Sequence, residues 1–148
     1  MVQAFLFAFC STAGFSVLFH VPKKHILSAG FAGAMGWLTY TWLIASGSGS
    51  VLSCFAGSCV VAMISELFAR SFKDAATVFI IPGILPLVPG ANMYYTMLAI
   101  LEGDVEKTAS VGTETILMAG SIAVALLVVA SAVKLLALMF RKLLTVRR

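Results

Sequence analysis

Five long apolar runs dominate this sequence, and they restrict the chain to a helical membrane fold. The runs cover residues 2–19, 26–46, 51–69, 76–101 and 111–140. Each is long enough to cross a hydrocarbon core of about 30 Å as a helix that rises ~1.5 Å per residue. Only 11% of the residues are charged, whereas a soluble domain has about 25%. We therefore predict one domain, an all-α integral membrane protein with about five transmembrane helices.

The basic residues predict how these spans are oriented. No basic segment precedes the first run, so we interpret it as an uncleaved span and not as a signal peptide. With the N-terminus outside, five crossings place residues 20–25, 70–75 and the basic tail 141–148 in the cytoplasm. Of the ten lysines and arginines, only Lys107 then lies outside, as the positive-inside rule requires. The sequence predicts a multi-pass protein of the plasma or inner membrane, with its C-terminus in the cytoplasm and its tail on lipid headgroups.

The fourth run is interrupted by the segment PGILPLVPG at residues 82–90. Proline removes a backbone donor and glycine relaxes the chain, so we expect the helix to break near the bilayer midplane. Backbone groups freed there must be buried in protein or must line a wet cavity. A helix that restarts after Gly90 would offer unpaired N–H groups and a partial positive charge to a carboxylate. The alternatives are a plain proline kink, satisfied by neighbouring helices, and a re-entrant segment.

Residues in this segment and directly after it are our candidates for binding a substrate. Asn92 offers both a donor and an acceptor, and the tyrosines that follow offer hydroxyl groups. The candidates are Pro82, Gly83, Pro86, Pro89, Gly90, Asn92, Tyr94 and Tyr95.

Glu66 and His20 are the candidates for coupling to an ion or a proton. Glu66 lies in the third run, where a charge is costly unless it is paired or wetted. Arg70 follows four residues later, so a surface ion pair along one helix is the alternative. His20 ends the first run, and an imidazole changes its charge near physiological pH. Its alternative role is that of an interfacial histidine at a helix end.

Small residues at a spacing of four predict where helices pack backbone to backbone. The pairs are Ala29 with Gly33, Ala32 with Gly36, and Ser53 with Gly57.

Several functional classes find no support in the sequence. Walker A, HExxH and GxSxG motifs are absent, so we do not expect an enzyme. We also expect no cofactor and no metal. The basic residues are spread over the segments that flank the spans and form no single patch, which argues against nucleic acid as a partner.

Two motifs and a glycine-rich run together carry a family resemblance. GFSVLFHVPKK occupies residues 14–24, and VFIIPGILPLVPGANMYYTM occupies residues 78–97; the second apolar run is rich in glycine. With these features the chain resembles the C-terminal half of the threonine/serine exporter family, which often has asparagine where this chain has His20. The motif matches are Pro82, Gly83, Pro86, Pro89, Gly90 and Tyr94.

The resemblance implies export of a small carboxylate-bearing solute, either threonine or serine or a dicarboxylate such as succinate, driven by an ion gradient. It also implies a partner, because in that family this half can occur as a separate small protein beside a second membrane subunit similar to the N-terminal half. A homo-oligomer is also open. Two further functions are a non-transporting membrane scaffold and a passive channel.

Overall fold

The computed structural model describes residues 2–146, with side chains described as far as Met139, and every regular element in that range is a helix. In order these are α1 (Val2–Leu18), η1 (Lys23–His25), α2 (Ile26–Ala45), α3 (Ser50–Phe72), α4 (Thr77–Ile84), η2 (Leu85–Leu87), α5 (Gly90–Glu102) and α6 (Val105–Val146). The prediction of an all-α protein is confirmed for these residues. Arg147 and Arg148, at the end of the predicted tail, lie outside the described residues.

Helix length and composition identify two membrane spans, or three if the broken helix is included. The segments Ser50–Phe72 and Val105–Met139 are each long and apolar enough to cross a membrane. The third is the pair Thr77–Leu87 and Gly90–Glu102, whose two parts are bent by 50°. Helices also lie over the first two predicted runs, but α1 has only 17 residues, and α2 contains many glycines, threonines and tryptophans, which lower its hydrophobicity. The chain is therefore a multi-pass helical membrane protein, and a count of five crossings goes beyond this finding.

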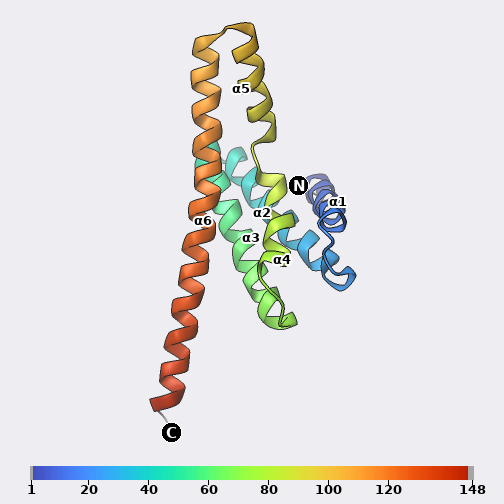
Figure 1. Cartoon of the computed structure of the whole chain (residues 1–148), viewed down its shortest axis with the longest axis vertical. Coiled ribbons are helices and arrows are strands. Elements are labelled where there is room, and N and C mark those ends of the chain that lie inside the picture. Colours follow the sequence, from blue (N-terminus) through green and yellow to red (C-terminus); the bar gives the residue numbers. More distant parts are fainter. Residues whose placement is uncertain (1, 147–148) are drawn as a thin grey trace.

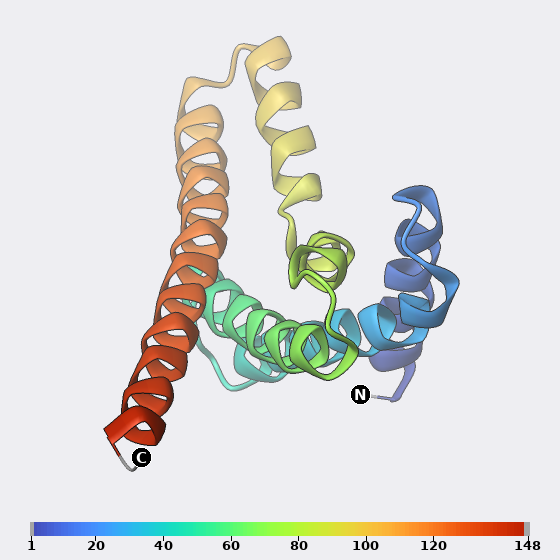
Figure 2. The same ribbon diagram turned by 60° about the horizontal axis from the view of Figure 1, so that its bottom comes forward.

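The helices form a cluster from which one hairpin projects. Helix α2 packs on α1 and α3, α4 packs on α2 and α3, and α3 packs on α6. Helix α5 turns away from the cluster and runs beside the first half of α6, with which it makes nearly all of its tertiary contacts (Figures 1 and 2). The far end of α6 lies at the opposite end of the molecule from the α5–α6 turn (Figure 1).

Close helix contacts occur at the small residues that the sequence singled out. A Cβ atom on Gly57 would lie 2.8 Å from the carbonyl oxygen of Gly36, so α2 and α3 touch backbone to backbone. At Gly33 the close neighbour is instead a side chain, that of Thr12 on α1. The predicted backbone-to-backbone packing is confirmed at Gly36 and Gly57. Gly83 adds another contact, because a Cβ there would lie 2.8 Å from Val61 Cγ1.

Candidate functional site

The fourth apolar run folds as two helices joined by a short non-helical link. Pro82 lies inside α4, which continues to Ile84, so the first proline does not end the helix. Pro86 occupies the 3-10 turn η2, and Pro89 is the N-cap of α5, which begins at Gly90. The chain therefore leaves helical geometry at Val88, which is extended, and at Pro89, and it is helical again from Gly90.

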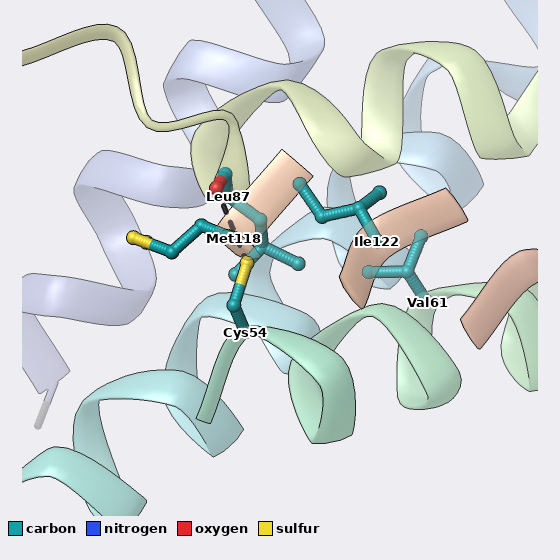
Figure 3. Close-up of a cluster of buried hydrophobic side chains, with 5 residues drawn as sticks. All are labelled: Cys54, Val61, Leu87, Met118 and Ile122. Atoms are coloured by element: carbon teal, nitrogen blue, oxygen red, sulfur yellow. Dashed lines mark hydrogen bonds between the residues drawn. The ribbon is translucent and has the colours of Figure 1, made fainter. Parts of the chain in front are cut away.

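Neighbouring helices hold the start of this link. Leu87 is buried against Cys54 and Val61 of α3 and against Met118 and Ile122 of α6 (Figure 3). Its carbonyl oxygen accepts a hydrogen bond from the Cys54 thiol at 3.6 Å. A carbonyl at the break is thus satisfied inside the protein, as membrane-depth backbone requires.

The first turn of α5 is open. The Gly90 N–H donates to Val88 O at 2.7 Å, and the Met93 N–H donates to Pro89 O at 3.0 Å. No side chain caps the helix, and Gly90 and Ala91 are exposed. Amides at an uncapped helix start favour an anion.

Two small pockets lie along the seam between α1 and the proline segment. His20 and Pro82 both line one of about 230 Å³, between the end of α1 and α4. Val78 lines this pocket too. Its carbonyl accepts no helical hydrogen bond from residue 82, because proline has no backbone N–H. Pro86 borders the other, of about 220 Å³, together with Ser11 of α1 and Trp37 of α2. The structure thus brings His20 and Pro82 together in one pocket, although they were predicted to have separate roles.

The polar candidates on α5 lie apart from these pockets. The Asn92 side-chain amide donates to Met118 Sδ at 3.8 Å and is half-buried. Tyr94 and Tyr95 are 65% and 49% exposed, and their ring centroids lie 5.5 Å apart. Neither tyrosine lines the two pockets that Pro82 and Pro86 border.

The expected ion pair between Glu66 and Arg70 is wrong. Both residues are described, and no ion pair joins them; Arg70 Nη2 instead donates to Val133 O of α6 at 3.3 Å. The guanidinium finds an acceptor on the packed neighbouring helix, and this contact replaces the one along its own helix. Glu66 remains half-buried near the end of α3.

His20 ends α1 in the left-handed conformation, with φ of 56°. The Val21 N–H donates to Ser16 O at 2.9 Å, which closes the last turn of the helix. Asparagine, aspartate and histidine tolerate this conformation better than other residues with a Cβ atom. The geometry supports the helix-end role that was the alternative for this residue.

We predict that His20→Gly stabilises the protein by about 1 kcal/mol, because glycine adopts this conformation without the steric cost of a Cβ atom. His20→Val should do the opposite, since a β-branched residue fits the left-handed region worst. Thermal unfolding in detergent checks both. A destabilised His20→Gly would mean that the imidazole itself is needed.

Sequence reasoning missed a pair formed by His25 and Asp74. His25 is fully buried, and its Nε2 lies 2.7 Å from Asp74 Oδ2. Lys24 Nζ approaches the same oxygen at 3.2 Å. The pair joins the α1–α2 link to the α3–α4 link, so it connects the two segments that the sequence places on the cytoplasmic side. The sequence offered one signal for this pair, because His25 and Asp74 both lie in segments predicted to be on the same side of the membrane.

Aromatic rings enclose the imidazole of His25. The ring centroids of Phe72 and Phe79 lie 4.8 Å and 5.0 Å from it, both edge-on. Nδ1 of His25 is buried and has no hydrogen-bond partner.

The contacts with His25 and Lys24 change the pKa of the Asp74 carboxyl. Hydrogen bonds from His25 and Lys24 hold the pKa of Asp74 below its usual range. A lowered carboxyl pKa contributes stability above the unfolded value of about 3.9, and this contribution is lost as the pH falls through the folded value. Asp74 is therefore ionised at neutral pH and accepts hydrogen bonds only.

Among the described residues, no group of three or more histidine, cysteine, aspartate and glutamate side chains is close enough to hold a metal ion.

Comparison with known proteins finds a matching family and a number of related proteins. The family model described as "Threonine/Serine exporter, ThrE" matches residues 4–132, which extends beyond the motifs at residues 14–97 into the fifth run. An uncharacterized protein of Haemophilus influenzae is 26% identical over 97 residues, which cover 66% of this chain and 33% of that protein. The chain thus spans about a third of the length of this curated relative. No solved structure gives a significant match.

Proposed function

This chain belongs to the threonine/serine exporter family, and we propose that it is one membrane subunit of a secondary exporter. The proposed cargo is a small solute with a carboxylate: threonine, serine, or a dicarboxylate such as succinate. In this proposal α1, α2, α3, the broken α4–α5 helix and α6 each cross the cell membrane. The N-terminus is outside and the C-terminus is in the cytoplasm, as the positive-inside rule favours. The family consists of membrane exporters and is not a class of enzymes.

The interrupted helix carries this proposal. Leu87, just before the break, is buried against α3 and α6, and the helix restarts at Gly90, which is exposed and has no side-chain cap. Helix starts of this kind receive the carboxylates of substrates at the midplane of other secondary transporters. Asn92, two residues into the same turn, would supply the additional donor, and all of the proposed solutes carry the carboxylate that such a start suits.

A second membrane subunit is the proposed partner. The chain aligns with only a third of its longer relative, and α5 has few tertiary contacts apart from those with α6. A subunit similar to the N-terminal half of the family would cover the outer face of α5 and bring the rest of the site. With five crossings in each subunit, the two would be related as an inverted repeat. A homo-oligomer is the competing assembly.

Efflux measurements test this function. Cells expressing the chain alone, or with a second subunit of the N-terminal type, are loaded with labelled threonine, serine or succinate, and efflux is followed with and without a proton uncoupler. We expect efflux only when both chains are present, and we expect the uncoupler to abolish it. Efflux from this chain alone would indicate a self-sufficient oligomer, and efflux insensitive to the uncoupler would indicate a passive channel. Absence of efflux in every combination would contradict the proposal and favour a scaffold.

A further inference from the structure

We propose that His25, held by Asp74, is the site at which this exporter binds the proton that couples transport to the proton gradient. This inference rests on the proposed function and adds the identity of the coupling residues. It places them at the ends of α2 and α3, on the predicted cytoplasmic side, and not at Glu66 or His20.

The hydrogen-bond geometry fixes which nitrogen receives the proton. Asp74 is ionised at neutral pH, so its oxygen can only accept, and Nε2 of His25, at 2.7 Å, must carry a hydrogen. The lone pair of the neutral ring is therefore on Nδ1, which is buried and has no donor near it. Imidazole is the side chain whose charge ordinarily changes in the physiological pH range. The structure thus holds an imidazole nitrogen whose lone pair is buried and unused.

Protonation of His25 would place a hydrogen-bond donor without an acceptor inside this packing. When a proton binds, one N–H bond forms at Nδ1 and the ring gains a positive charge, which Asp74 and its hydrogen bond partly balance. The new N–H is enclosed by the edges of Phe72 and Phe79 and has no acceptor within hydrogen-bond distance. Because an unsatisfied buried donor is costly, the protonated form should favour a state in which this enclosure opens. Loss of the proton by the reverse step restores the closed packing.

The surrounding charges leave Asp74 as the partner of the imidazole. The charged residues and the other histidine on or next to the adjoining elements are Lys23 and Lys24 on η1, Glu66 and Arg70 on α3, Lys73 directly after α3, and His20 after α1; α4 has none. The remaining titratable groups are Tyr40 on α2 and Cys54 and Cys59 on α3. Of these, Lys24 alone contacts the pair, through Asp74 Oδ2 at 3.2 Å. Lys24 and Asp74 are partly exposed, with side chains 66% and 37% accessible. The Nε2 end of the buried imidazole is therefore joined to water through a carboxylate at the surface, whereas Nδ1 stays enclosed in the closed packing.

A purely structural role is the competing explanation, because the same contacts clamp two links together. His25→Gln separates the two roles. The glutamine amide can still donate to Asp74 from a similar position, but it cannot take up a proton. The test uses the chain with its partner subunit in membrane vesicles and measures two rates for a labelled solute that the exporter moves. The first is net efflux driven by a proton gradient, and the second is exchange of labelled for unlabelled solute with no gradient.

For His25→Gln we expect net efflux to fall to the rate that the wild type shows with an uncoupler, while exchange continues at the wild-type rate. Gradient-driven efflux that persists in this variant overturns the proposal. Loss of both rates, with less inserted protein, also overturns it, because the role is then structural. His20→Gln in the same assay decides between the two histidines: loss of coupling there, with His25→Gln still coupled, assigns the proton to His20.

A direct measurement keeps the inference separate from the identity of the solute. In the purified chain with ¹⁵N-labelled histidine, the Nδ1 signal of His25, assigned by its loss in His25→Gln, should change reversibly from unprotonated to protonated as the pH is lowered. A signal that stays unprotonated until the protein unfolds overturns the proposal, even if export is observed. If Nδ1 titrates but the wild type moves none of the solutes, the proposed function fails and the proton site stands without it.

Discussion

Replacing Gly57 with alanine should destabilise the protein by about 1–3 kcal/mol, the usual cost of overfilling a packed interface. The added Cβ would lie 2.8 Å from the carbonyl oxygen of Gly36 and 3.2 Å from Leu87 Cδ2. A backbone carbonyl inside a helix cannot rotate away as the end of a flexible side chain can, so α2 and α3 would have to separate. Leu87 belongs to the buried cluster at the break, and the same methyl group would therefore loosen the start of the non-helical link.

Thermal unfolding in detergent, followed by circular dichroism, measures this effect. Gly120→Ala is the matched control, because a Cβ on that exposed glycine of α6 would meet nothing within 4 Å. The control should unfold at the wild-type temperature or above it, since alanine favours a helix more than glycine by about 1 kcal/mol. Equal midpoints for Gly57→Ala and Gly120→Ala would mean that the two helices are not in backbone contact.

The helices and their contact points were largely predictable from local sequence. An apolar run of sufficient length specifies a helix in lipid, because every backbone group must be satisfied within its own segment. Ala32 and Gly36 lie on one face of α2, and Ser53 and Gly57 lie on one face of α3. Each spacing of four residues could therefore be recognised without knowledge of the partner helix. The number of crossings was less secure, since the glycines that pack α2 so closely also lower its hydrophobicity.

The position of the break was only partly predictable. Three prolines mark the segment, but Pro82 is accommodated inside α4, and helical geometry is lost only at Val88 and Pro89. Contacts made by the residues between them decide this: Gly83 lies against Val61, and Leu87 is buried between α3 and α6. These contacts come from elements distant in the sequence, so proline content alone could not locate the break.

Side-chain partners were the least predictable feature. The spacing of Glu66 and Arg70 suits a pair on one helix, yet Arg70 bonds to a carbonyl 63 residues away. His25 and Asp74 are separated by 49 residues, and neither is unusual in its local sequence. Both outcomes depend on tertiary packing, which periodicity does not encode. The residues to which we assign coupling therefore emerge only when the α1–α2 and α3–α4 links are brought together.

Replacing Gly90 with leucine should abolish export without preventing folding or insertion. A Cβ at Gly90 would meet nothing within 4 Å, and this glycine does not have a positive φ, so the chain itself tolerates a side chain there. In the proposed site, however, that space lies in front of the open amides of the first turn of α5, where the carboxylate would bind. A leucine would occupy it and would offer no donor in exchange.

Labelled efflux, together with the amount of protein in the membrane fraction, measures this prediction. The control is Gly14→Leu, which adds the same side chain at another glycine with nothing within 4 Å, on the exposed side of α1 and away from the break. We expect both variants to insert like the wild type and only Gly90→Leu to lose efflux. A Cβ at Gly90 would meet no other part of this chain within 4 Å. Loss of transport would therefore place the solute or the partner subunit directly at this helix start. Normal efflux from Gly90→Leu would show that neither one needs this space, and the carboxylate site would have to be sought elsewhere.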